Sequence, residues 1–210
     1  MGTEVNSRVD ATNLSLLKEN CQKWPDKVWM RKKDKGIWNE YTWKECYEQI
    51  KHFSLGLMSL GFSRGDKIAI IGDNDPHWFW AELAAQAAGG AVTGIFSSSS
   101  PAEVQHIVGL SDATFVVAQD QEQVDKVLSI KDKLPLVKRV IFWDSKGMRN
   151  YDDPALLSFE DVVKLGREYA GVHLTLFEES VDQGKGDDLA LLVCTSGTTG
   201  LPKLSMVTHT

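Results

Sequence analysis

A short stretch near the end of the sequence has the residue types and spacing of a polyphosphate-binding loop. It consists of Thr195, Ser196, Gly197, Thr198, Thr199 and Gly200, with Lys203 three residues further on. The two glycines allow a tight turn and let the backbone come close to a ligand. Hydroxyl and free backbone N–H groups donate hydrogen bonds to phosphate oxygens, and the lysine adds a positive charge. We therefore predict that these seven residues bind the phosphates of a nucleotide.

The residues before this stretch predict the strand that positions it. Residues 189–193 form a continuous apolar run, which is typical of a strand buried on both faces. A surface turn rich in Ser, Thr and Gly is the plainer interpretation of such a composition. The stretch also differs from a Walker loop, in which glycine and lysine are adjacent. Here Leu201 and Pro202 separate Gly200 from Lys203.

The elements further upstream predict an α/β fold, with a layered, largely parallel sheet and helices on both faces. Strand and helix patterns alternate over residues 67–143 at the spacing of βαβ units,. Ligands of such sheets bind beyond the carboxyl ends of the strands, which is where the loop after Val193 would lie. We expect residues 1–12 to be a flexible N-terminus and residues 13–210 to form one α/β unit, with Asn13 capping its first helix.

Some local signals are specific enough to place single elements. The segment 34–36 lies between two strand-like runs and predicts a β-hairpin,. Thr42 and Glu45 have the spacing of a capping box, so a helix is expected to follow and to run to about Ser59. Ser100 is expected to cap a further helix.

Composition and charge limit the class of protein. Hydrophobic residues make up 42% and charged residues 25% of the 210 positions, as in ordinary soluble domains. The net charge of -6 argues against nucleic acid as the main partner. The first residues lack the pattern of a signal peptide, and the richest apolar stretch, residues 78–92, is too short to span a bilayer. We expect a cytoplasmic protein, and leave peripheral membrane contact and a homodimer open.

Cysteine usage indicates a reducing compartment. Cys21, Cys46 and Cys194 are far apart and form no Cys-x-x-Cys pair, so no disulfide framework is indicated. Cys194 borders the loop, but its position at the end of an apolar strand favours a buried, inert thiol over a nucleophile.

Four other groups could do chemistry but have plainer interpretations. We interpret His77 as a capping or solvent residue, since no carboxylate partner can be named for an acid or base. We interpret the aromatic run 78–80 as packing in the core and between subunits, in preference to the wall of a substrate pocket. The serines 97–100 favour a linker and helix cap over a second anion site. The acidic pairs 152–153 and 187–188 are poorly spaced for a metal ion and favour solvated loop ends.

The string Thr-Ser-Gly-Thr-Thr-Gly-Leu-Pro-Lys that ends at Lys203 resembles the signature loop of the adenylate-forming enzymes, the acyl-CoA synthetase and luciferase superfamily. Other segments are also similar to that family, namely residues 13–28, 41–45, 65–70 and 88–104. The resemblance therefore extends over nearly the whole chain. Among subfamilies it is nearest to the bacterial-type long-chain fatty acid–CoA ligases.

Three positions near the loop bear on this resemblance. Leu204 stands where the family often has glycine, and Gly94 where many members carry proline. Neither departure removes the phosphate-binding residues. His209 resembles the histidine that commonly follows the loop, and we interpret it as structural.

The resemblance implies a reaction in two steps. A carboxylate, such as a fatty acid, attacks the α-phosphate of ATP to give an acyl-adenylate and pyrophosphate. The thiol of coenzyme A then displaces AMP and forms the thioester. Mg²⁺ and preorganised donors would neutralise charge that develops on the phosphates. The resemblance assigns this role to the loop from Thr195 to Gly200 with Lys203 nearby, and the most direct contacts to Thr198 and Thr199.

The resemblance also implies that catalysis needs more than this chain. Members of the family continue well past the position of Thr210, and carry there the adenine pocket, the Mg²⁺-binding glutamate, the acyl tunnel and a catalytic lysine. We therefore expect the N-terminal part of a large adenylation domain, with no catalytic residue of its own and no activity alone. The alternatives are an amino-acid or aryl-acid adenylating enzyme, a non-catalytic phosphate- or protein-binding domain, and a short chain that assembles with a second polypeptide.

Overall fold

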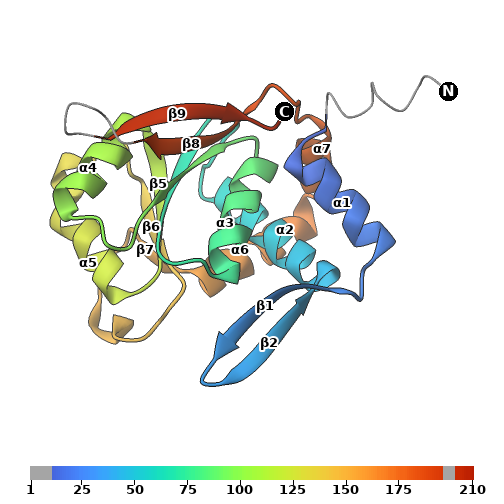
Figure 1. Ribbon diagram of the computed structural model, residues 1–210, viewed down its shortest axis with the longest axis horizontal. Coiled ribbons are helices and arrows are strands. Elements are labelled where there is room, and N and C mark those ends of the chain that lie inside the picture. Colours follow the sequence, from blue (N-terminus) through green and yellow to red (C-terminus); the bar gives the residue numbers. More distant parts are fainter. Residues whose placement is uncertain (1–10, 196–201) are drawn as a thin grey trace.

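A seven-stranded sheet forms the centre of the computed structural model, which describes residues 11–195 and 202–210. In spatial order the strands are β7 (Leu156–Ser158), β6 (Arg139–Phe142), β5 (Ala113–Ala118), β3 (Lys67–Ile71), β4 (Ala91–Ile95), β8 (Leu189–Thr195) and β9 (Lys203–Thr208) (Figure 1). Every neighbouring pair is parallel except β8 and β9. The predicted α/β fold with a largely parallel sheet is confirmed.

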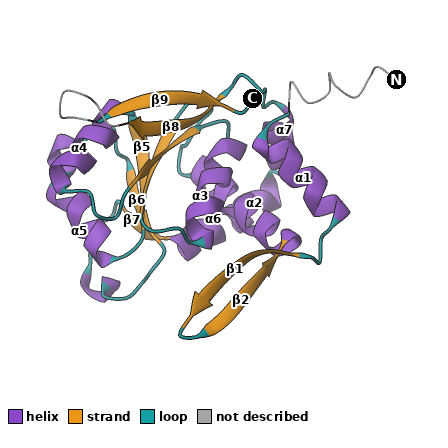
Figure 2. Cartoon of the chain, viewed as in Figure 1, coloured by secondary structure: helices purple, strands orange, loops and turns teal. Residues whose placement is uncertain are grey.

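Helices cover both faces of this sheet. The first face carries α2 (Trp43–Ser59), α3 (Pro76–Ala87) and α6 (Phe159–Val172), with α1 (Asn13–Lys23) and α7 (Leu176–Asp182) packed beside them. The second face carries α4 (Pro101–Leu110) and α5 (Gln121–Ser129) (Figure 2). Successive residues of β3 point to opposite faces of the sheet. Ile68 and Ile70 pack in the core on the first face, and Ala69 and Ile71 pack in the core on the second.

A second, two-stranded sheet stands apart from the first. It consists of β1 (Val28–Asp34) and β2 (Ile37–Thr42), which pair antiparallel and project from the body of the molecule (Figure 1). Lys35 and Gly36 have φ angles of 47° and 86°. Positive φ at both central residues is typical of the type I′ turn that suits the twist of a hairpin. The predicted β-hairpin is confirmed.

The helix caps follow the sequence signals with one exception. Thr42 with Glu45 and Ser100 with Glu103 form capping boxes at α2 and α4, as predicted. The first helix is capped by Thr12 rather than by Asn13, because the hydroxyl of Thr12 accepts a hydrogen bond from the backbone N–H of Ser15. The division into a flexible segment 1–12 and a unit 13–210 stays a prediction.

Three regular elements were not expected from the sequence: β7, α7 and β9. The first has three residues and the second has seven, which is too short for a clear periodicity. Two 3₁₀ helices, Lys131–Lys133 and Met148–Asn150, lie in the connections before β6 and before β7. Within the described ranges, no helix has both the length and the apolar character needed to cross a bilayer.

Candidate phosphate-binding site

Strand β8 carries the predicted loop to the carboxyl edge of the parallel sheet. Its residues Leu191 and Leu192 pair with Val92 and Thr93 of β4. The buried hydroxyl of Thr93 also donates a hydrogen bond of 3.0 Å to the carbonyl oxygen of Leu192. This contact fixes β8 against a largely buried strand just before the loop begins.

The two ends of the predicted loop meet at the base of a hairpin. Thr195 and Lys203 are paired residues at the ends of β8 and β9. The hydroxyl of Thr195 lies 3.4 Å from the carbonyl oxygen of Lys203. The Lys203 side chain is exposed, and no ion pair joins it to a residue in 11–195 or 202–210. The structure thus brings the first predicted donor and the predicted cation together.

The other predicted site residues lie outside the described part of the chain. They are Ser196, Gly197, Thr198, Thr199 and Gly200. Their assignment to phosphate binding stays a prediction from the sequence.

A residue that the sequence did not indicate holds the hairpin from the side. His106 on α4 has its Nε2 atom 2.9 Å from the carbonyl oxygen of Pro202, the residue before β9. Because a carbonyl can only accept, Nε2 must carry the proton and donate it. Helix α4 is itself fixed by the buried side chains of Val104 and Ile107. His106 therefore ties one end of the loop to a rigid helix.

The neighbouring strand ends carry polar groups that satisfy one another. The hydroxyl of Ser97 donates to a carboxylate oxygen of Asp73 at 2.8 Å, and Gln119 accepts from the Asp73 backbone N–H at 2.7 Å. Lys126 donates to the backbone carbonyl of Ser97 at 2.6 Å. With Ser100 capping α4, the serine run serves as the linker and cap that the sequence favoured.

Two expectations about β8 need correction. Its outer half is not buried on both faces, because Val193 is 43% exposed, whereas Leu191 on the same face still packs against the core. Cys194 is half-buried rather than buried, with its sulfur 3.7 Å from the carbonyl oxygen of Gly94. Burial nevertheless raises the pKa of the Cys194 thiol, which disfavours the thiolate that a nucleophile needs.

His77 has a carboxylate partner after all, contrary to the sequence interpretation. Its Nδ1 atom lies 2.7 Å from Asp75, and Asp75 caps α3 and also pairs with Lys32. The imidazole ring packs against Trp80 and Phe159. These contacts hold the N-terminal end of α3 in place, so we assign His77 a structural role.

The aromatic run on α3 is divided between core and surface. Trp80 is 4% exposed and Phe79 is 38% exposed. Trp78 packs over Gly94, where an added Cβ would lie 3.1 Å from its ring. The glycine that replaces the family's frequent proline thus makes room for this side chain.

One carboxylate of each acidic pair lies beside a cationic side chain of the fold. Asp153 pairs with Lys131 at 2.7 Å, and Asp188 pairs with Arg64 at 3.4 Å. In the described ranges no three His, Cys, Asp or Glu side chains gather as metal ligands would. The described residues therefore do not fit a protein-held Mg²⁺ site.

His209 and Gln86 connect the end of β9 and β8 to the helices. The Nδ1 atom of His209 accepts a hydrogen bond of 3.4 Å from the backbone N–H of Asn13, and burial lowers the pKa of its imidazole. Gln86 on α3 lies 3.4 Å from the carbonyl oxygen of Ala190 and accepts from the Asn13 side chain. These contacts are structural, as expected for His209.

Comparison with known proteins identifies relatives by sequence. The profile of the family described as "AMP-binding enzyme" matches residues 17–210. The long-chain-fatty-acid–CoA ligase ACSBG2 of Xenopus laevis is 29% identical over 207 residues, which cover 99% of this chain and 27% of that protein. The long-chain-fatty-acid–CoA ligase ACSBG1 of Rattus norvegicus is 33% identical over 182 residues, which cover 85% of this chain and 24% of that protein.

Solved structures share the fold. The anthranilate CoA ligase AuaEII has a TM-score of 0.78 at 18% identity, over 98% of this chain and 36% of that one. The acetoacetyl-CoA synthetase from Streptomyces lividans has a TM-score of 0.77 at 19% identity, over 95% of this chain and 30% of that one. At these identities the likeness concerns the fold alone.

The sequence match is partial for the relatives but nearly complete for this chain. The chain spans about a quarter of the length of the curated relatives it matches. The family profile, in contrast, covers all but the first 16 residues. The chain therefore belongs to the AMP-binding enzyme family, the adenylate-forming enzymes that its loop sequence resembles.

Proposed function

We propose that this chain supplies the phosphate-binding hairpin of an ATP-dependent long-chain fatty acid–CoA ligase. The observation that carries the proposal is the position of the signature loop, between the paired residues Thr195 and Lys203 at the carboxyl edge of the sheet. The printed names of the relatives support the acid class, since they are long-chain-fatty-acid–CoA ligases. The bacterial-type assignment stays a prediction.

In this proposal the parent enzyme joins a fatty acid to coenzyme A at the expense of ATP. The fatty acid carboxylate attacks the α-phosphate, pyrophosphate leaves, and the thiol of coenzyme A then replaces AMP. The hydroxyl groups and backbone N–H groups of the loop hold the departing phosphates. Preorganised donors of this kind stabilise charge that develops in the transition state.

Lys203 and His106 have different parts in this proposal. Lys203 follows the loop in the sequence, and its exposed ammonium would attract a phosphate bound there. His106 does not touch the substrate; it restrains the backbone at Pro202 through its hydrogen bond. Mg²⁺ would supply further charge neutralisation when bound to the phosphates, but no residue in 11–195 or 202–210 is assigned as its ligand.

Acyl-CoA formation by the polypeptide that the gene encodes tests the acid class. Short, long and aromatic carboxylates and amino acids would be offered with ATP and coenzyme A, and thioesters would be measured by mass spectrometry. The proposal predicts turnover with long-chain acids above the other classes. Preferred turnover of an aromatic acid or amino acid would contradict it and favour the alternative adenylating enzymes.

A further inference from the structure

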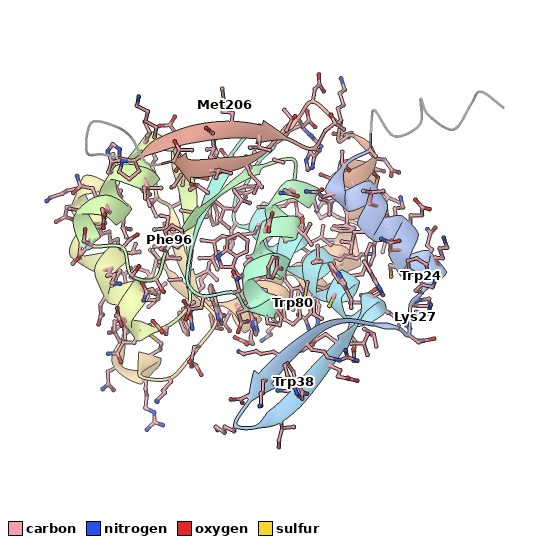
Figure 3. The ribbon with its side chains drawn as sticks, viewed as in Figure 1. Trp24, Lys27, Trp38, Trp80, Phe96 and Met206 are labelled. Atoms are coloured by element: carbon pink, nitrogen blue, oxygen red, sulfur yellow. The ribbon has the colours of Figure 1, made fainter. Side chains whose placement is uncertain are left out.

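The tip of the β1–β2 hairpin exposes two large apolar side chains. Ile37 is 69% exposed and Trp38 is 59% exposed, directly after the turn at Lys35 and Gly36. The hairpin projects from the body of the molecule, and Trp38 lies on it, well away from the exposed Phe96 and Met206 (Figure 3). These side chains therefore lie where a large flat surface could reach them.

The hairpin does not need these two side chains for its attachment. Its root is held by the stacked rings of Trp29 and Trp43, 4.4 Å apart, and by the edge contact of Tyr41 with Trp80. Lys32 adds an ion pair with the buried carboxylate of Asp75. Isolated two-stranded hairpins are marginally stable, so these root contacts account for its order.

Charge is concentrated on the same hairpin. Residues 28–42 carry four cationic side chains and two carboxylates, in a chain of net charge -6. Arg31 pairs with Glu40, and Lys32 with Asp75. Lys33 and Lys35 at the tip are exposed and form no ion pair with the described residues, although the Lys33 ammonium lies 5.9 Å from the Trp38 ring.

A groove continues the apolar surface toward α3. It has a volume of about 480 Å³ and lies between the hairpin and the start of the helix. Its lining includes Met30, Trp38 and Phe79 beside Lys32 and Lys33. Apolar side chains beside ammonium groups are suited to a molecule with an apolar part and an anionic head.

We propose that the β1–β2 tip docks this protein onto the surface of an anionic lipid bilayer. Trp38 and Ile37 enter the boundary between headgroups and acyl chains, where tryptophan is favoured. Lys33 and Lys35 meet the lipid phosphates, as cationic residues do near anionic leaflets. A bilayer fits better than a protein partner because the apolar and cationic groups lie together on a protruding tip. The inference does not depend on the proposed ligase activity.

Vesicle co-sedimentation of the full gene-encoded polypeptide tests this docking. The probes are vesicles of phosphatidylcholine alone and of phosphatidylcholine mixed with phosphatidylglycerol. We expect binding to the mixed vesicles that weakens as salt is raised. The double variant Ile37→Ser, Trp38→Ser should lower the partition coefficient by about tenfold or more. Charge reversal in Lys33→Glu, Lys35→Glu should lower it by at least about fivefold per lysine.

Two matched variants control for general effects. Leu174→Ser removes an apolar side chain that is 81% exposed elsewhere, and Lys164→Glu reverses an exposed lysine on α6; both should bind vesicles as the wild type does. Circular dichroism checks that each variant is folded, and Trp38→Phe provides a milder change if the double variant is not. The proposal is overturned if the wild type ignores anionic vesicles, or if the hairpin variants bind them unchanged. A hairpin variant that alters only self-association would also overturn it.

Discussion

The molecule contains two antiparallel hairpins that are built in opposite ways. The β8–β9 hairpin extends the large sheet, and β4, Thr93 and His106 hold it on two sides. The β1–β2 hairpin belongs to no larger sheet and is attached through the rings of Trp29 and Tyr41 and through the ion pair of Lys32 with Asp75. The first therefore has the restraint that a binding loop needs, whereas the second offers a protruding surface.

Helix α3 lies between these two hairpins and contacts both. At its N-terminal end the cap Asp75 binds Lys32 of β1. Near its C-terminal end Gln86 reaches the backbone of β8. One helix therefore serves two attachments, one through the ion pair of a buried carboxylate with a partly exposed lysine and one through a neutral hydrogen bond. We therefore expect changes at the β8–β9 hairpin to affect activity, and changes at the β1–β2 hairpin to affect stability.

The largest expected effect concerns the loop between β8 and β9. Thr199→Val removes a predicted phosphate donor, and we expect pyrophosphate exchange by the gene-encoded polypeptide to fall by about 10²–10³-fold, or about 3–4 kcal/mol. The matched control is Thr208→Val, which removes an exposed hydroxyl at the far end of β9. Equal rates for the two variants would argue against a phosphate role for the loop.

The next effect concerns the root of the other hairpin. Asp75→Ala removes a buried carboxylate that caps α3 and binds Lys32 and His77. We expect the free energy of unfolding to fall by about 3 kcal/mol, measured by urea denaturation. Glu40→Ala, which breaks the exposed pair with Arg31 on the same hairpin, should cost under about 1 kcal/mol. A similar cost for both variants would mean that burial at the root is unimportant.

Acid should weaken the same root. Burial alone would raise the pKa of Asp75, but hydrogen bonds from His77 and Lys32 outweigh it and lower the pKa from 3.8 to about 2. The ionised carboxylate therefore stabilises the fold above about pH 4, and this contribution, about 2 kcal/mol, is lost as the pH falls toward 2. Denaturation curves of the wild type and of Asp75→Asn should converge over this range. A constant difference between the curves would refute the assignment.

Glu82, in the middle of α3, should show the opposite pH dependence. Burial raises the pKa of its carboxyl from 4.5 to about 7, and the hydrogen bond from Gln86 only partly opposes this. The protonated carboxyl stabilises the fold below about pH 4.5, and the benefit disappears as the pH rises through 7. Glu82→Gln should stabilise the protein by about 1–2 kcal/mol above about pH 8 and change little at about pH 4.5. Thermal unfolding at the two pH values measures this, and equal shifts at both would contradict it.

The smallest effect should come from the tie between α4 and the loop. His106→Phe removes the donor to the Pro202 carbonyl, and a lost hydrogen bond of about 1 kcal/mol corresponds to about fivefold. We therefore expect the KM for ATP to rise about fivefold, with little change in the free energy of unfolding. His106→Gln keeps a donor and should restore part of the affinity, whereas Gln105→Ala on the same helix should leave KM unchanged. Loss of stability without a change in KM would show that His106 only packs.

The sequence predicted those parts of the fold that depend on neighbouring residues. The buried strands β3 to β5 and the capping boxes at Thr42 and Ser100 follow from short-range patterns, and the structure has them. It did not predict the last strand β9, nor the exposed outer half of β8 at Val193. Both depend on which elements lie alongside in space.

The candidate site could be predicted only in part, because some of its contacts join residues that are distant in the sequence. The loop signature is contiguous from Thr195 to Lys203, so it could be recognised without a structure. The contact of His106 with Pro202 joins residues 96 positions apart, and no local pattern marks it. The partner of His77 was missed although Asp75 is only two residues away and Pro76 at the first helical position marks Asp75 as the cap,.

Acid-dependent ATP–pyrophosphate exchange tests whether this chain supplies the phosphate-binding part of an adenylate-forming ligase. The assay would compare the polypeptide from the uninterrupted gene with the 210-residue chain, each supplied with long-chain fatty acids. We expect exchange by the gene-encoded polypeptide and none by the 210-residue chain alone, which would supply only the phosphate-binding hairpin. Exchange by the short chain, or no exchange by the gene-encoded polypeptide with any acid, would contradict it.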